Sequence, residues 1–597
     1  MKLRRQFLIN APLSLLAVAT ASSATQINPE QAPAGAPPTF GTTPAVGPEV
    51  SANTFAEAEK LMQVTMSAAQ REMAAQSWRT TMASTMERRI GPHRLTLEEN
   101  IAPATNWNPV LEGSKIKLRR DQFIRSRGQT GPLPLSDDDI AFAPVTKLSG
   151  WIAAKLISSE RLTGIYLDRI ARFDPKLRCV ITLTREHALA QAKQADKEIA
   201  AGKYRGPLHG IPYGVKDLLD TAGIATTWGA EPYKNRIPVT DSAVVARLNA
   251  AGAVLIAKLS LGALALNDVW FGGQTMNPWL LEEGASGSSA GPGAATAAGL
   301  VAFSIGSETG GSIISPSMRC GITGLRPTYG RVPRTGAMTL CWSLDKLGPM
   351  TRSVEDAMLV LKAISGQDHG DVASVPSTLD FDANRSVKGL KIGYIPAWMT
   401  EAPATDVDRA ALAAAKTLGM IPTPVSIPDW PYGSLNVILF AEAAAAFEDI
   451  TLDGRANELK AQVPDAWPNI FRQARFLSAV DFVQADRLRR KVAIEMARLF
   501  TEVDLLLVPS LRDEMLTISN FTGHPSLTLR TGTVQVSEVR SDWAPDPANP
   551  SAKFKTPRSV PHGITLIGRL FDEGTMANVG LALEKFFAVA SQRPPGF

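Results

Sequence analysis

A glycine-rich stretch from Gly284 to Thr328 holds the residues whose types and spacing could do chemistry. Within it, the turn Thr309-Gly310-Gly311-Ser312 can direct several backbone N–H groups toward one point beside a serine oxygen. Acyl transfer requires this combination of a nucleophile and hydrogen-bond donors for the developing oxyanion. The stretch therefore predicts a serine-based acyl-transfer site.

A flexible Gly/Ser linker is the alternative interpretation of so many glycines. Such linkers, however, do not carry an apolar run like Leu300–Ile305, nor the apolar residues Cys320, Ile322 and Leu325 that follow it. This apolar content requires burial, so the glycines are expected inside a packed domain, where they permit close backbone approach and positive φ.

The stretch, GASGSSAGPGAATAAGLVAFSIGSETGGSIISPSMRCGITGLRPT, resembles the signature segment of the amidase signature family of serine hydrolases. The similarity continues through most of the chain after about residue 146. It implies an α/β fold: one large amidase-signature domain with a mixed β-sheet core and helices on both faces. It also implies an amidase, a hydrolase that cleaves a linear carboxamide C–N bond through a seryl acyl-enzyme, with a small-molecule amide as substrate and no cofactor.

The family's catalytic machinery, one lysine and two serines, maps onto Lys216, Ser288 and Ser312. Lysine is a base only when neutral, and burial lowers its pKa toward that state. Ser288, which the resemblance places after a cis Gly287–Ser288 bond, is both donor and acceptor and would relay the proton of the nucleophile Ser312 to Lys216. The family's oxyanion hole maps to the backbone N–H groups of Thr309, Gly310, Gly311 and Ser312.

Two positions depart from the family pattern. The aspartate expected before TGGS is Glu308, and the arginine expected two residues after the nucleophile is Ile314. Glu308 keeps the charge with a longer reach, whereas Ile314 removes a cation, so the partner of that arginine must differ. A Ser-His-Asp interpretation through His209 or His524 is disfavoured, because both lie in patterns the family uses structurally and no GxSxG elbow accompanies them. Asp345, in DKLGP, is expected in a structural loop.

The elements that must position these residues alternate along the chain. A strand is expected to end at Lys216, and apolar runs at 254–257, 300–305, 390–395, 505–508 and 564–567 alternate with helical stretches. This alternation indicates a layered α/β domain with a largely buried sheet. Aromatic residues between about Pro428 and Arg487 are expected in the core, with an aromatic wall of the acyl pocket as the alternative. They are Trp430, Tyr432, Trp467, Phe471, Phe476 and Phe482.

The N-terminal residues predict an export signal followed by an extension of the main domain. Residues 1–24 combine Arg4-Arg5, a short apolar stretch and small residues, typical of an export signal and too short to anchor the chain in a membrane. The Arg-Arg start resembles a twin-arginine motif, an ordinary secretory signal being the alternative, so a periplasmic or secreted location is expected. Residues 25–53 are expected as a disordered linker, 54–133 as a helical extension and 134–597 as the amidase signature domain.

Within the extension, Thr54 and Glu57 form a capping-box pattern, and apolar residues on one face predict a single long helix to about Arg89. We favour docking of this helix on the main domain, with a homodimer contact or a lid as the alternative.

Composition excludes other classes. The 597 residues are 45% hydrophobic and 20% charged, which is typical of a globular chain with a large core. A net charge of +5 is too small to indicate binding to nucleic acid or an anionic membrane. Three cysteines define no disulfide framework, and no metal-ligand pattern is present.

Three functions compete. The leading one is an exported amidohydrolase. The amidase subunit of a tRNA-dependent amidotransferase is the second, which the export signal disfavours because charged tRNA is cytoplasmic. A catalytically silent scaffold is the third, motivated by Ile314 and the long extension.

Overall fold

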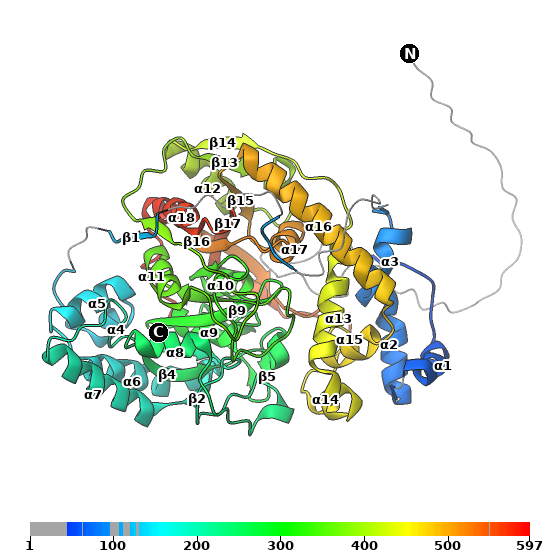
Figure 1. The fold of residues 1–597 in the computed structure, drawn as a ribbon, viewed down its shortest axis with the longest axis horizontal. Helices are drawn as coiled ribbons and strands as arrows, with labels where there is room; N and C mark the ends of the chain where they lie inside the picture. Colours follow the sequence, from blue (N-terminus) through cyan, green and yellow to red (C-terminus); the bar gives the residue numbers. More distant parts are fainter. Residues whose placement is uncertain (1–43, 63, 96–106, 112–119, 127–129, 549) are drawn as a thin grey trace, which may run out of the picture.

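The structure is a computed structural model that describes residues 44–62, 64–95, 107–111, 120–126, 130–548 and 550–597 (Figure 1). The predicted export signal and most of the predicted linker lie outside the described residues. Among those that are described, none of the helices has both the length and the apolar character that a bilayer span requires.

One eleven-stranded mixed sheet runs through the molecule. Its order is β14 (Ile421–Pro424), β13 (Lys391–Tyr394), β15 (Leu505–Pro509), β17 (Lys553–Gly568), β16 (Ser526–Glu538), β10 (Thr323–Arg326), β11 (Lys346–Thr351), β9 (Phe303–Glu308), β3 (Pro212–Lys216), β4 (Val254–Leu259) and β2 (Val180–Leu183). Three two-stranded sheets accompany it: β1 (Gln122–Ile124) with β12 (Asp380–Asp382), β5 (Val269–Trp270) with β6 (Gly273–Gln274), and β7 (Met276–Asn277) with β8 (Leu280–Gly284).

The part of the sheet that matters for the site is the parallel trio β9-β3-β4, whose residues are all buried. Burial on both faces explains why these strands are continuous apolar or small-residue runs rather than alternating ones. Tyr213 pairs with Phe303 and Val215 with Ile305, so the carboxyl ends of β3 and β9 meet at one edge. Lys216 ends β3 at this edge, as the sequence predicted.

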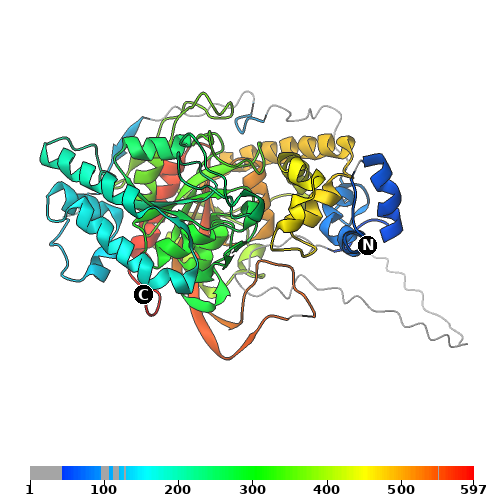
Figure 2. The ribbon, with the colours of Figure 1, turned by 90° about the horizontal axis from the view of Figure 1, so that it is seen from below.

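Helices cover both faces of the sheet (Figures 1 and 2). Leu527 of β16 lies against Gly580 of α18 (Glu573–Phe587). Arg530, three residues further on, lies against Gly321, which follows α10 (Ile314–Cys320). Alternate strand residues face opposite sides, so α10 and α18 occupy opposite layers. α9 (Ala290–Ala297) packs on α10 (Ile314–Cys320), and α11 (Val354–Ile364) on α18 (Glu573–Phe587).

The remaining helices complete the two layers and one end of the molecule. They are α4 (Asp137–Ala141), α5 (Val145–Ala153), α6 (Ser159–Leu177), α7 (Arg185–Ala200), α8 (Ala243–Ala250), α12 (Asp406–Thr417), α13 (Asn436–Ala446), α14 (Glu448–Leu452), α15 (Trp467–Ala474), α16 (Ala479–Glu502) and α17 (Asp513–Phe521). Ser158 caps α6 as its sequence indicates, accepting the Arg161 N–H over 3.0 Å.

The predicted extension, residues 54–133, is helical in its described part up to Ile90 and contains strand β1 further on, and the prediction of one long helix is wrong. The structure has α1 (Ala52–Met62), α2 (Ala68–Thr81) and α3 (Ala83–Ile90). The capping box is formed by Ser67 and Gln70 at the start of α2 rather than by Thr54 and Glu57. The break lets α1 fold back on α2, so that the rings of Phe55 and Trp78 lie 5.5 Å apart.

The extension docks on the main domain, the role we favoured, where its helices lie beside α13 and α15 (Figures 1 and 2). Gln473 of α15 donates to the Ala74 carbonyl over 2.9 Å, and Asn469 donates to Ser77 Oγ over 3.1 Å. Residues 44–51, expected at the end of a disordered linker, pack here too: Val46 is buried and its N–H donates to the Arg79 carbonyl.

Candidate active site

Lys216 is fully buried among hydroxyl groups. Its Nζ donates to Ser288 Oγ and Ser307 Oγ over 2.8 Å each and to Ser289 Oγ over 3.1 Å. Burial lowers the pKa of Lys216 well below its usual range, although the carboxylates of Asp345 and Glu308 act in the opposite direction. The amine is therefore driven toward the neutral form that a base requires.

Three local structures bring these groups together. Lys216 ends β3, and Ser307 lies on the neighbouring parallel strand β9. Ser288 and Ser289 immediately precede α9, after a cis peptide bond between Gly287 and Ser288, as the resemblance implied. Gly287 has no space for a side chain, because a Cβ would lie 1.7 Å from the Asn267 carbonyl oxygen.

The turn that carries Ser312 adjoins this lysine centre. The Ser289 N–H donates to the Ser312 carbonyl over 3.2 Å, which ties the two backbones together. In the described chain, the backbone N–H groups of Gly310, Gly311 and Ser312 donate to no protein acceptor. Gly311 has φ +120°, a conformation that favours glycine. Three unpaired N–H groups beside a serine are the arrangement expected of an oxyanion hole.

Thr309, the remaining oxyanion-hole candidate, is held in place by a hydrogen bond from its side chain to Asp345. Its Oγ1 donates to Asp345 over 2.6 Å, and the same carboxylate accepts the N–H groups of Leu340 and Cys341. Asp345 thus fixes the turn's first residue, consistent with the structural role expected of its loop.

Glu308 and Ile314 each have a clear structural setting. Glu308 accepts the N–H groups of Ile313 and Ile314 over 2.8 and 2.9 Å, and pairs with Arg326 over 2.6 Å. Burial raises the pKa of Glu308, but the Arg326 charge and these hydrogen bonds outweigh it and hold that pKa below its usual value. Ile314 packs with Met318, Leu511 and Leu516. Glu308 thus has Arg326 as its cation, while Ile314 contributes only apolar packing.

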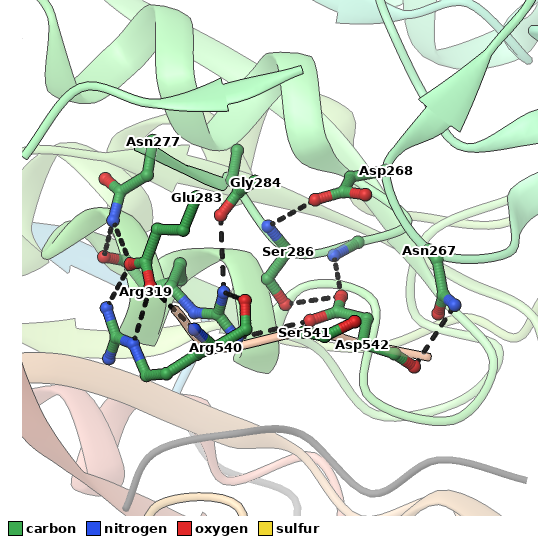
Figure 3. A network of polar contacts seen from close by, with 12 residues as sticks. Asn267, Asp268, Asn277, Glu283, Gly284, Ser286, Arg319, Arg540, Ser541 and Asp542 are labelled. Atoms are coloured by element: carbon green, nitrogen blue, oxygen red, sulfur yellow. Dashed lines mark hydrogen bonds and ion pairs between the residues drawn. The ribbon is translucent and has the colours of Figure 1, made fainter. Parts of the chain in front are cut away.

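A buried polar network holds the loop before Ser288 (Figure 3). Asp542, from the segment joining β16 to β17, accepts the Ser286 hydroxyl over 2.8 Å and the Gly287 N–H over 2.7 Å. Asp268 accepts the Ser286 N–H over 3.2 Å, and Arg319 pairs with Asp542 over 3.2 Å. The network thus fixes the position of Ser286 and Gly287, which immediately precede Ser288.

The charges of this network do not cancel when all groups are ionised. Asp268, Glu283 and Asp542 face Arg319 and Arg540, and all five side chains are buried. Burial and the neighbouring Asp542 charge raise the pKa of Asp268 to about 7, and burial also raises the pKa of Asp542. Asp268 and Asp542, rather than Glu283, are therefore the carboxyls of this network that are driven toward the protonated form.

A cavity of about 570 Å³ opens on the Ser312 turn. Thr309, Gly310 and Ser312 form part of its lining, whereas Lys216 and Ser288 are buried and do not line it. Of the aromatic residues singled out in the sequence, Trp430, Tyr432 and Trp467 line the cavity. Phe471 stacks on Trp467, and Phe476 contacts Phe55. Core packing thus applies to some residues of that segment, three others line the cavity, and their role as an acyl-pocket wall stays a prediction.

Comparison with known proteins agrees with this site. The profile of the family described as Amidase matches residues 161–576, which is more than half of the chain. The chain belongs to the amidase family. A glutamyl-tRNA(Gln) amidotransferase subunit from Carboxydothermus hydrogenoformans is 34% identical over 492 residues, covering 76% of this chain and 99% of the relative.

Two further relatives of this amidase are named as amidases. The putative amidase AmiD of Mycobacterium bovis is 34% identical over 480 residues, covering 78% of this chain and 98% of the relative. The crystal structure of the peptide amidase of Stenotrophomonas maltophilia superposes with a TM-score of 0.64 at 27% identity, covering 76% of this chain and 98% of that one. The protein is therefore an amide-hydrolysing enzyme with the predicted fold, not a silent scaffold.

The two histidines of the alternative Ser-His-Asp interpretation lie away from this amidase's cavity. His209 contacts Glu198 and His524 contacts Thr522, and neither lines the cavity. Burial lowers the pKa of His524 to about 3. Ser289, Ser307 and Asp542 were missed. The pair of serines at residues 288 and 289 could have indicated that Ser289 also lies near the lysine. Nothing in the sequence links Asp542 to Ser286.

Proposed function

We propose that this amidase hydrolyses a carboxamide through an acyl-enzyme on Ser312, with Lys216 as the base and Ser288 as the relay between them. The observation that carries the proposal is the buried 2.8 Å contact from Lys216 Nζ to Ser288 Oγ, next to the Ser289–Ser312 backbone hydrogen bond and a cavity that Ser312 lines. A neutral lysine, a hydroxyl relay and an accessible serine are the parts that nucleophilic catalysis requires.

Acylation begins when Ser312 Oγ attacks the carbonyl carbon. Its proton passes to Ser288 Oγ while the Ser288 proton passes to Lys216 Nζ, leaving an ammonium ion and a tetrahedral oxyanion. The unpaired N–H groups of Gly310, Gly311 and Ser312 stabilise that oxyanion, and losing one such donor typically costs about 10²–10³ in rate. The C–N bond then breaks as the proton returns from Lys216 through Ser288 to the nitrogen, which leaves as ammonia or an amine.

Deacylation uses the same groups in the same order. A water molecule in the cavity attacks the acyl carbon while its proton moves through Ser288 to Lys216. The ester bond to Ser312 then breaks, and Ser312 Oγ recovers the proton. The products are a carboxylate and a regenerated enzyme.

We further propose that the protein acts outside the cytoplasm, on the basis of residues 1–24. This location favours a self-contained amidohydrolase over a component of an amidotransferase, although one relative is named as belonging to such an enzyme. Fractionation of the native host tests the location: a mature form lacking residues 1–24 outside the cytoplasm is expected, and an uncleaved cytoplasmic form would revive the amidotransferase alternative.

The activity is tested with the purified chain and a panel of amides of varied acyl length. Release of carboxylate and amine by the protein alone is expected, together with its loss in Ser312→Ala. An activity that appears only with partner subunits, glutamine and charged tRNA would instead support the amidotransferase alternative.

A further inference from the structure

The cavity in front of Ser312 has an unusual charge distribution. Its described lining contains no lysine or arginine, and His93 is the only residue there with a basic side chain. Six carboxylate residues line it: Glu87, Asp429, Asp465, Asp513, Glu514 and Asp542. Because these come from segments far apart in sequence, the negative lining belongs to the cavity as a whole and not to one turn.

Three of the six carboxylates already have a positively charged or basic partner. Glu514 pairs with Arg512 over 2.7 Å and Asp542 with Arg319 over 3.2 Å. Asp429 lies 3.2 Å from the ring nitrogen of His93. The arginine partners of Glu514 and Asp542 leave little charge for a ligand, and the Asp429 side chain is 86% exposed to solvent.

The other three, Glu87, Asp465 and Asp513, form no ion pair in the part of the chain that the structure describes. Glu87 belongs to α3 of the extension, Asp465 precedes α15, and Asp513 begins α17. Asp465 is only 5% exposed, and the donor to its carboxylate is the uncharged Ala544 N–H, at 2.8 Å. Glu87 is half-buried and accepts the His93 N–H over 3.1 Å, and Asp513 is exposed to the cavity. Of the three, Asp465 is the buried carboxylate, and a buried carboxylate is costly unless a cation compensates it.

The pKa values of two of these carboxyl groups and an unpaired amide oxygen of Asn520 also favour a positively charged ligand. Burial raises the pKa of Asp465. The surrounding protein and the nearby Glu514 charge raise the pKa of Asp513 to about 7 against the opposing charge of Arg512, and the Asp513 side chain itself is open to the solvent of the cavity. Independently, Asn520 lines the cavity and its Oδ1 is a buried acceptor without a donor, while its Nδ2 donates to Glu308 over 2.9 Å. A buried acceptor without a donor at the cavity wall favours a ligand that brings N–H groups.

Aromatic side chains complete the wall. Trp398, Trp430, Tyr432 and Trp467 line the same cavity. Aromatic faces attract ammonium and guanidinium groups, most strongly where water is excluded. Arg512 and Lys491 lie over the rings of Trp398 and Trp430 but do not line the cavity.

We propose that the cavity selects amides carrying a positive charge, an ammonium or guanidinium group, which the carboxylates of Glu87, Asp465 and Asp513 receive. The inference rests on the proposed function, since it concerns the substrate of that same site. It also gives the extension a role, because Glu87 on α3 supplies one of the three carboxylates.

A matched ligand pair tests the proposal: Nα-acetyl-arginine amide and Nα-acetyl-citrulline amide, which differ in replacing a guanidinium by a neutral group of the same shape. The kcat/KM ratio should favour the arginine amide by about tenfold or more, as close charge pairs do elsewhere. Asp513→Asn, Asp465→Asn and Glu87→Gln should each reduce that ratio. Asp429→Asn, at a carboxylate already beside His93, is the matched control and should reduce it least.

A second measurement separates binding from turnover. In Ser312→Ala, calorimetry should show tighter binding of the arginine amide than of the citrulline amide. Cleavage of both amides with equal kcat/KM would overturn the charge proposal while the amidase function stands. Preferential binding by Ser312→Ala without cleavage of either amide by the parent enzyme would support the charge proposal and contradict the proposed function. Equal binding of the two would overturn the charge proposal whatever the parent cleaves.

Discussion

Lys216 Nζ lies 2.8 Å from Ser288 Oγ, and among the described residues no carboxylate forms an ion pair with this lysine. Lys258, which is also buried and which neighbours Lys216 across β3 and β4, instead pairs with Asp217 over 3.0 Å. The two lysines share a sheet and a degree of burial but differ in their partners. Lys216 alone is surrounded by hydroxyl groups, which accommodate a neutral amine.

Replacing Lys216 with alanine should slow amide hydrolysis more than hydrolysis of an ester with the same acyl group. An amine needs a proton to leave, whereas an alkoxide or phenoxide leaves with less help. A difference of about tenfold or more, which corresponds to at least roughly 1.4 kcal/mol, is expected from kcat/KM on the two substrates. Equal losses would assign the proton transfer to another residue.

The pH dependence of the parent enzyme should report the same group. Burial lowers the pKa of Lys216, and the protonated form cannot act as a base, so amide turnover should fall as the pH drops through that lowered pKa. The residual activity of Lys216→Ala should lack this acidic limb. An acidic limb that the variant retains at the same pH would mean that a different group titrates.

Asp542→Asn should lower kcat more than it changes KM. The substitution weakens the acceptor of the Ser286 hydroxyl and the Gly287 N–H, and it removes the negative charge that pairs with Arg319. The loop before Ser288 is then held less firmly in position. Losses of about 10-fold to 100-fold are expected from misplacement of a reacting group. Asp546→Asn, at an exposed carboxylate of the same segment, is the control and should behave like the parent.

Arg326→Met should destabilise the fold strongly, since it leaves the buried Glu308 charge without its cation. Removing one partner of a buried ion pair costs about 3–5 kcal/mol. Arg498→Met, at an exposed pair with Glu495, should cost less than about 1 kcal/mol. Denaturant unfolding measures both, and similar small losses would contradict the importance of the Glu308 pair.

Asp268→Asn should make stability less sensitive to pH. With a pKa of about 7 in the folded state and near 3.8 when unfolded, Asp268 holds a proton that the unfolded chain has released between those values. Its contribution is therefore present at low pH and is lost as the pH rises to about 7. The stability of the variant relative to the parent should accordingly increase from pH 5 to pH 8. A constant difference would show that Asp268 does not titrate there.

Much of this arrangement was predictable because it depends on local sequence. The apolar strand that ends at Lys216 and the serines of the glycine-rich stretch are contiguous patterns, and family resemblance placed them in one site. What escaped prediction depends on distant segments. Asp542 accepts a hydrogen bond from Ser286, which is 256 residues away in the sequence. Arg326 forms an ion pair with Glu308, which lies on a different strand of the sheet. The apolar face of the extension's helices could be predicted from the sequence. The breaks before Ala68 and at Met82 could not, because they depend on the packing of α1 against α2 and of α2 against α15.

The most direct test of the account is which serine becomes acylated. Treatment with a fluorophosphonate, followed by peptide mass spectrometry, should find one adduct, on the peptide that contains Ser312. Ser312→Ala should abolish it, and Lys216→Ala should slow its formation. An adduct on another serine, with Ser312 unmodified, would contradict the central claim that Ser312 is the nucleophile.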